Sequence, residues 1–87
     1  MTIFEFADAI NKEIVIRYYP NQNDRFSASF ERCEISEPNI LIGVYGDGKS
    51  PAGAIDDYLN KIRGQKIVFN AHGNNRQEFT VPKKLTI

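Results

Sequence analysis

The sequence predicts a single small α+β domain in which two helices cover one face of a mainly antiparallel sheet. Two segments carry apolar residues at helical spacing, and several others show the alternating or β-branched patterns of strands, with short polar turns between them. The predicted order along the chain is α-β-β-β-α-β, with room for one further strand at the end. A length of 87 residues accommodates one domain, residues 1–87, around one core.

The first helix is predicted over residues 2–12. Its apolar positions recur every three to four residues, as on one face of a helix: Ile3, Phe6, Ala7 and Ile10. Thr2 is suited to the N-cap, and Glu5 stands three residues later, as in a capping box.

A β-hairpin is predicted for residues 13–19 and 25–32, joined by the polar turn PNQND at residues 20–24. The first of these segments is β-branched and aromatic, and the second alternates apolar and polar residues. A second turn, SEPN at residues 36–39, precedes a third strand at residues 40–45. Short turns of this kind join antiparallel strands.

The second helix is predicted to begin after the breaker GDGKSP, with Ser50 as N-cap and Pro51 at the first helical position. Its apolar face consists of Ala54, Ile55, Tyr58, Leu59 and Ile62. Asp56 and Asp57 are expected near the positive end of the helix dipole, and Gly64 is expected to end the helix.

A fourth strand is predicted at residues 66–71 and a short fifth strand at residues 76–81. The connection through the second helix predicts a right-handed crossover, with the fourth strand parallel to an earlier one.

The two sides of the predicted sheet differ in chemistry. The side covered by the helices would carry Phe26, Ala28, Phe30, Ile40, Ile42 and Val44. The uncovered side would carry Val15, Arg17, Tyr19, Arg25, Ser27, Ser29, Glu31, Leu41 and Tyr45. Tyrosine and arginine are enriched where proteins bind partners, so Arg17, Tyr19, Arg25 and Tyr45 are the candidate partner-binding residues. A merely solvated face and self-association through this face are the alternatives.

Composition narrows the classes of function. Eleven basic side chains balance eleven acidic ones, so the net charge typical of general nucleic-acid binders and of DNA mimics is missing. Cys33 is the only cysteine, which excludes an internal disulfide and a cysteine-based zinc site. A lone thiol favours a cytoplasmic location, and no signal peptide or long apolar run predicts export or a membrane partner.

One segment matches a nucleotide-binding motif. Residues 43–50, GVYGDGKS, satisfy G-x-x-x-x-G-K-[ST] between a strand and a helix, the setting of a P-loop. A P-loop enzyme also needs a parallel sheet and a second strand that ends in a metal-binding aspartate, and neither is predicted here. The glycines are explained as a turn and Ser50 with Pro51 as a helix start, so nucleotide binding is the second, less favoured alternative.

No set of residues forms predicted catalytic machinery. Cys33 and the only histidine, His72, allow a nucleophile–base pair formally, but a strand-end cysteine and a turn histidine explain them more simply. Adjacent Asp56 and Asp57 diverge on a helix and do not form an acid–base pair. We therefore expect no enzymatic activity, metal or cofactor.

Basic residues are frequent late in the chain. If they converge, Arg63, Lys66, His72 and Arg76 would form a patch for a phosphate backbone, which makes nucleic-acid binding the first alternative function. The α-β-β-β-α order is similar to that of the double-stranded-RNA-binding domain. That family has a lysine-rich start to its last helix, whereas this helix begins SPAGAIDD.

Residues 14–70 resemble the HicB-like domain, a partial RNase H type fold. The likeness is carried by RFSASFERCEI and by YGDGKSPAGAIDDYLNKI, in which a strand, a glycine turn, Ser-Pro and an amphipathic helix follow one another. The DNA-binding segment that HicB antitoxins usually add is missing from QEFTVPKKLTI, and the first helix is additional. A nuclease of the RNase H fold needs converging strand carboxylates, and those positions here hold Ile, Phe, Ser and Arg.

Nearly the whole chain resembles small proteins of Gram-positive phages and prophages. The shared features are the hairpin YYPNQNDRFSASF, the G-x-G-x-[ST]-P helix start, IRGQKI and the ending RQEFTVP. This resemblance implies a stand-alone phage accessory protein in the host cytoplasm. We expect a non-enzymatic module that binds an unidentified protein and modulates a host or phage factor. An exposed edge strand leaves a homo-oligomer open.

Overall fold

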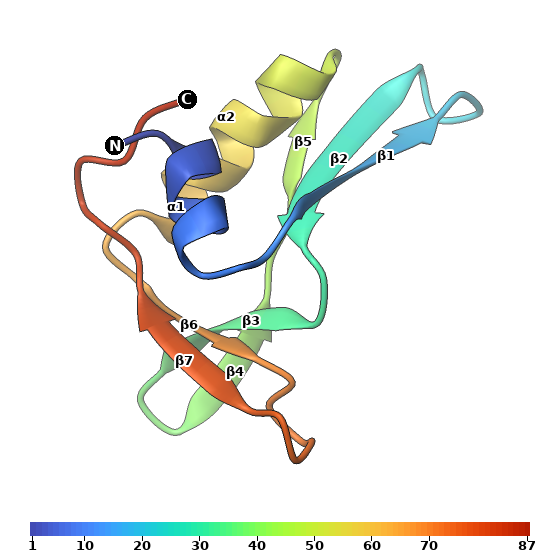
Figure 1. The fold of residues 1–87 in the computed structure, drawn as a ribbon. Helices are drawn as coiled ribbons and strands as arrows, with labels where there is room; N and C mark the ends of the chain where they lie inside the picture. The colour runs from blue at the N-terminus through green and yellow to red at the C-terminus, as the bar shows by residue number, and fades with distance from the viewer.

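The computed structural model describes residues 1–87 and contains two helices and seven strands (Figure 1). In chain order the elements are α1 Ile3–Ala9, β1 Ile14–Tyr19, β2 Arg25–Phe30, β3 Cys33–Glu37, β4 Ile40–Gly43, β5 Gly46–Gly48, α2 Pro51–Ile62, β6 Lys66–Phe69 and β7 Gln77–Thr80. The α+β class is confirmed. Two strands were missing from the prediction, since β3 occupies part of the predicted turn and β5 is built from the predicted breaker.

The strands form two antiparallel sheets, ordered β1-β2-β5 and β4-β3-β6-β7. Helix α2 leads from the edge of the first sheet into the second, where β6 pairs antiparallel with both β3 and β7. The predicted parallel crossover is therefore wrong. Its premise was a single sheet, whereas α2 connects two sheets.

One long hairpin runs through both sheets, and its two arms separate where one sheet ends and the other begins. Strands β2 and β3 form one arm, and β4 and β5 form the other. The last pair of the first sheet is Ala28–Gly46 and the first pair of the second is Glu34–Gly43, with five residues, 29–33, facing only two, 44–45. Arg32 lies within this excess and has a positive φ of 51°. The surplus residues bulge out of the pairing and end the first sheet.

Helix α2 lies directly against the backbone of β5. A Cβ at Gly46 would collide with the Ala54 carbonyl, and one at Gly48 with the Ala54 amide. Only glycine permits this approach. Ser50 Oγ accepts from the Gly53 amide at 3.0 Å, Pro51 follows as the first helical residue, and Gly64 has φ +71° beyond the end. The predicted start and end of this helix are confirmed.

Helix α1 also contributes to the core and lies next to the two chain ends (Figure 1). The predicted capping box is present, with the Glu5 amide donating to Thr2 Oγ1 and the Thr2 amide donating to Glu5 Oε1. The Ile3 amide donates to the Thr86 carbonyl at 2.6 Å, and the Thr86 amide donates to the Met1 carbonyl at 3.1 Å. These bonds hold the two ends side by side. Neither helix has the length and hydrophobicity that a membrane span requires.

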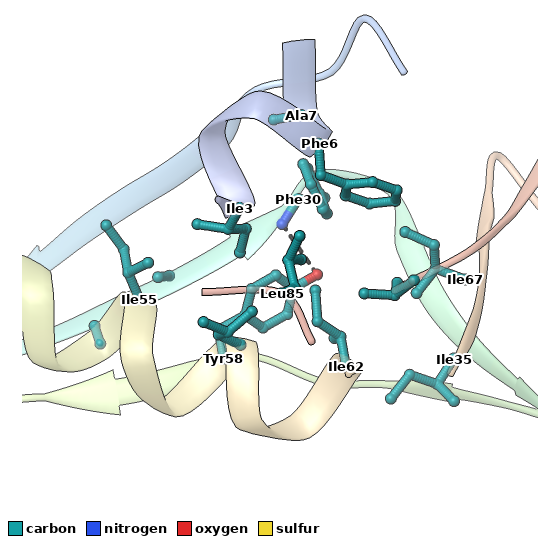
Figure 2. Packing of buried hydrophobic residues seen from close by; sticks show 14 of the residues in the cluster. Ile3, Phe6, Ala7, Phe30, Ile35, Ile55, Tyr58, Ile62, Ile67 and Leu85 are labelled. Atoms are coloured by element: carbon teal, nitrogen blue, oxygen red, sulfur yellow. Dashed lines mark hydrogen bonds between the residues drawn. The ribbon is translucent and has the colours of Figure 1, made fainter. Parts of the chain in front are cut away.

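The core lies between the helices and the two sheets (Figure 2). Phe30 is at its centre, with edge-on contacts to Phe6, Tyr58 and Phe69. The predicted apolar face of α2 is buried, and that of α1 is buried at Ile3, Phe6 and Ala7, while Ile10 is partly buried just beyond the helix. Both helices meet the face of the first sheet that carries Ala28 and Phe30: α2 packs against β2, and Phe6 of α1 contacts Phe30. The prediction for Ile40 and Ile42 is wrong. They belong to the second sheet and are 57% and 38% exposed.

Candidate functional site

A groove of about 510 Å³ lies where the long hairpin divides. It is bounded by β1 and β2 on one side and by the segment between β4 and β5 on the other. Its lining residues are Arg17, Tyr19, Arg25, Ser27, Ser29, Phe30, Cys33, Gly43, Val44 and Tyr45. We call this the hairpin groove. The four partner-binding residues predicted from the sequence all line it.

Strand register explains why these side chains share one face. Arg17 pairs with Ser27, and Tyr19 pairs with Arg25, so all four point away from the helices. Residues directly opposite each other in a sheet project to the same side. Tyr45 joins them from the bend between β4 and β5. Of the other residues predicted for this face, Leu41 lies in the second sheet and does not line the groove.

Each arginine of the groove lies close to a carboxylate that is not part of the groove lining. Arg17 Nη2 lies 3.2 Å from Glu31 Oε1, with both side chains more than half exposed. Arg25 Nε lies 3.4 Å from Asp47 Oδ1 without a hydrogen bond, and its guanidinium stands 4.7 Å from the centre of the Tyr19 ring. Stacking of this kind fixes the arginine plane. Neither carboxylate lines the groove itself, so its wall carries two arginines and no acidic side chain.

The groove lining includes an exposed aromatic ring and two serines. Tyr45 is 50% exposed, and its backbone carbonyl accepts from Lys61 Nζ at 2.9 Å. Ser27 is the only buried polar residue of the protein, and Ser29 is half-buried. A partner would therefore meet an exposed aromatic ring, two arginines and small hydroxyls.

Cys33 also lines the groove but is poorly suited to nucleophilic chemistry. Burial raises the pKa of its thiol to about 11. Since the thiolate is the reactive form, almost none is present near neutral pH. Cys33 and His72 both line a separate pocket of about 470 Å³, where no hydrogen bond joins them. The geometry thus places the lone thiol and lone imidazole near one another without activating the thiol.

The late basic residues do not form one free cationic surface. Glu78 binds both Lys66 and Arg76, at 2.6 and 3.1 Å, and these cations lower the pKa of its carboxyl. Arg63 faces the C-terminal segment, where its Nε donates to the Leu85 carbonyl at 2.7 Å. His72 is exposed in the turn after β6. Ion pairing with Glu78 reduces the charge that a phosphate backbone would meet.

The motif GVYGDGKS is used structurally. Gly46–Gly48 forms β5, paired with β2, and the Asp47 amide donates to Asp57 Oδ2. Lys49 Nζ donates to the Asn23 carbonyl, and Ser50 caps α2. A P-loop instead presents free amides around the phosphates. No cluster of three or more potential metal-ligating side chains is present in the protein.

Sequence reasoning missed the part of the groove supplied by Phe30, Cys33, Gly43 and Val44, since it assigned Phe30 and Val44 only to the side covered by the helices. The available signal was a shift in the alternation of apolar residues, which occupy even positions at 26, 28 and 30 and then odd positions at 33 and 35. Such a shift moves the chain from one sheet face to the other. Comparison of the chain with protein-family models, with curated proteins and with solved structures found no match.

Proposed function

We propose that this protein is a non-enzymatic binding module that takes an acidic segment of a partner protein into the hairpin groove. The observation that carries the proposal is the lining of the groove, which combines two arginines and two tyrosines with no carboxylate. Aromatic residues and arginine supply most of the binding energy in protein interfaces. Following the sequence resemblance, we propose that it serves as an accessory protein of a phage or prophage in the host cytoplasm.

Of the two arginines, Arg17 is the one available for exchange of partners. The pair Arg17–Glu31 is solvent-exposed on both sides, and exposed ion pairs contribute only about 0–1 kcal/mol. An incoming carboxylate can therefore replace Glu31 at little cost. Arg25 is more tightly held because it stacks on Tyr19 and faces Asp47. We infer that Arg25 shapes the groove while Arg17 contacts the partner.

Tyr45 supplies the apolar part of the same surface. Its ring is half exposed at the groove, and Lys61 Nζ lies 5.9 Å from the ring centre on the side of α2. A tyrosine ring adds contact area with little loss of side-chain entropy. A partner that places an acidic residue on Arg17 and an apolar residue on Tyr45 would contact both the cationic and the aromatic part of the groove.

The test is affinity capture from host lysate with a tagged protein, with and without nuclease, followed by mass spectrometry. Arg17→Ala and Tyr45→Ala should each reduce recovery of a specific protein, and raised salt should release it. Arg76→Ala is the matched control, because Arg76 is also exposed and lies 3.1 Å from a glutamate.

Two outcomes would overturn the proposal. Recovery that is lost in Arg76→Ala and after nuclease treatment would favour nucleic-acid binding by the late basic residues. Recovery that is equal in Arg17→Ala, Tyr45→Ala and the unaltered protein would exclude the groove as the binding surface. Circular dichroism of each variant separates these results from loss of the fold.

A further inference from the structure

The two sheets leave four edge strands, and three of them carry a charge. These are β1 with Arg17, β5 with Asp47 and β7 with Glu78. A charge in an edge strand opposes pairing with a second copy, since like charges then meet across the new interface. These three edges are protected against self-association.

Edge β5 is protected in a second way. Asp57 and Lys61, one helical turn apart on α2, reach over it. The Asp47 amide donates to Asp57 Oδ2 at 2.8 Å, and Lys61 Nζ donates to the Tyr45 carbonyl at 2.9 Å. Backbone groups that would otherwise be open to another strand are thereby satisfied by side chains.

Strand β4 has neither form of protection. Its sequence, ILIG, contains no charged residue and no proline, and no side chain hydrogen-bonds to its backbone. Ile40 and Ile42 are 57% and 38% exposed on one side of it. An exposed apolar edge strand of this kind is a template for pairing with another strand.

We propose that a second copy of this chain covers β4, with the two β4 strands antiparallel about a twofold axis. In a register centred on Leu41, Ile40 of one copy lies opposite Ile42 of the other, on the same face. Apolar side chains then meet apolar side chains and no like charges are opposed. The chain has zero net charge, so overall repulsion between copies is absent. The two four-stranded sheets become one continuous sheet of eight strands.

A second copy suits this edge because antiparallel pairing makes an uncharged strand complementary to itself. The interface lies in the second sheet, whereas most of the hairpin groove belongs to the first. The inference is therefore independent of the proposed function.

The test is sedimentation velocity across about a hundredfold range of protein concentration, where mass action should shift monomer to dimer. Ile42→Lys places a charge in the interface and should leave the protein monomeric. The matched control is Ile16→Lys on β1, because Ile16 is also an edge-strand isoleucine and is 37% exposed. It should dimerise like the unaltered protein.

Hydrogen exchange provides a second readout. Amides of β4 should exchange more slowly at high concentration than at low concentration, and Ile42→Lys should abolish this difference. The proposal is wrong if the unaltered protein stays monomeric throughout. It is also wrong if Ile16→Lys, and not Ile42→Lys, prevents association, or if concentration-dependent protection falls on β1 or β7. Thermal melts of both variants establish that they fold.

Discussion

The carboxylate of Asp57 accepts a hydrogen bond from the backbone amide of Asp47 at 2.8 Å and also binds Lys61 at 3.1 Å. The sequence suggested that Asp57 and its neighbour Asp56 interact with the helix dipole. That interpretation is wrong, because the first turn of α2 holds no acidic residue. Asp57 instead attaches the helix to the outer side of β5.

Replacing Asp57 by asparagine should therefore destabilise the protein in a pH-dependent way. The Asp47 amide, and after it Lys61, hold the pKa of the Asp57 carboxyl below its usual value of 3.8. A group with a lowered native pKa stabilises the fold above its ordinary pKa and loses that effect as the pH falls. Because the side chain is partly exposed, we expect a loss on the order of 1 kcal/mol at pH 7 for Asp57→Asn.

Thermal melts of Asp57→Asn from neutral to acidic pH would check this. The difference in Tm from the unaltered protein should shrink as the pH falls below 3.8. Asp56→Asn is the control, since Asp56 is exposed and makes no ion pair. A Tm difference that is independent of pH, or equal in both variants, would contradict the predicted role of Asp57.

Substituting Gly46 should be far more damaging than substituting Gly43, although the two are three residues apart. A Cβ at Gly46 would collide with the Ala54 carbonyl and with the backbone of Tyr58, whereas one at Gly43 has nothing within 4 Å. Overpacking of this kind costs about 1–3 kcal/mol or more. Denaturant titration should show a large loss of stability for Gly46→Ala and little for Gly43→Ala, and similar midpoints would count against the close helix–strand contact.

Removing the hydroxyl of Tyr58 should destabilise the core. Tyr58 is 1% exposed, and its oxygen accepts from the Phe30 amide at 3.2 Å, as Figure 2 shows. Tyr58→Phe leaves that amide without this partner, which costs about 1–3 kcal/mol. Tyr45→Phe, at an exposed ring, should leave the denaturation midpoint unchanged. Equal midpoints for the two variants would show that the buried bond contributes nothing.

Cys33 should react slowly with thiol reagents until the solution is strongly alkaline. Burial raises the pKa of the thiol from 9.0 to about 11, so at a pH well below 9 the thiolate population is about a hundredfold smaller than in a free thiol. The rate of reaction with a chromogenic disulfide should rise with pH well beyond 9, and protein unfolded in denaturant should react much faster. Equal rates for folded and unfolded protein would contradict this.

The helices were predictable because each signal was local. Periodic apolar residues, the Thr2 and Ser50 caps and Gly64 all act within a few positions of the chain, and the caps and Gly64 are found where expected. Helix α1 nevertheless ends at Ala9, short of the predicted residue 12. The groove residues Arg17, Tyr19 and Arg25 were predicted to share a face for the same reason, since alternation along paired strands is also local.

The division into two sheets depended on information spread over both arms of the hairpin. The segment 31–32 reads as a continuation of its strand, and its bulge becomes evident only when it faces the shorter arm, residues 44–45. Likewise, the segment GDG resembles a turn in the sequence. Its glycines are required because α2 packs directly against their backbone, and this contact is not visible in the sequence. Tertiary contacts determined these features, and strand propensity is sensitive to such context.

The bonds between the Ile3 amide and the Thr86 carbonyl, and between the Thr86 amide and the Met1 carbonyl, make the fold nearly circular. The two ends run parallel there, so a short linker from Ile87 to Met1 would only have to turn back over a few residues. The chain could then be opened at the exposed turn 20–24 with every sheet pairing retained. In such a permuted chain the contacts between segments, and not their order along the chain, would define the architecture.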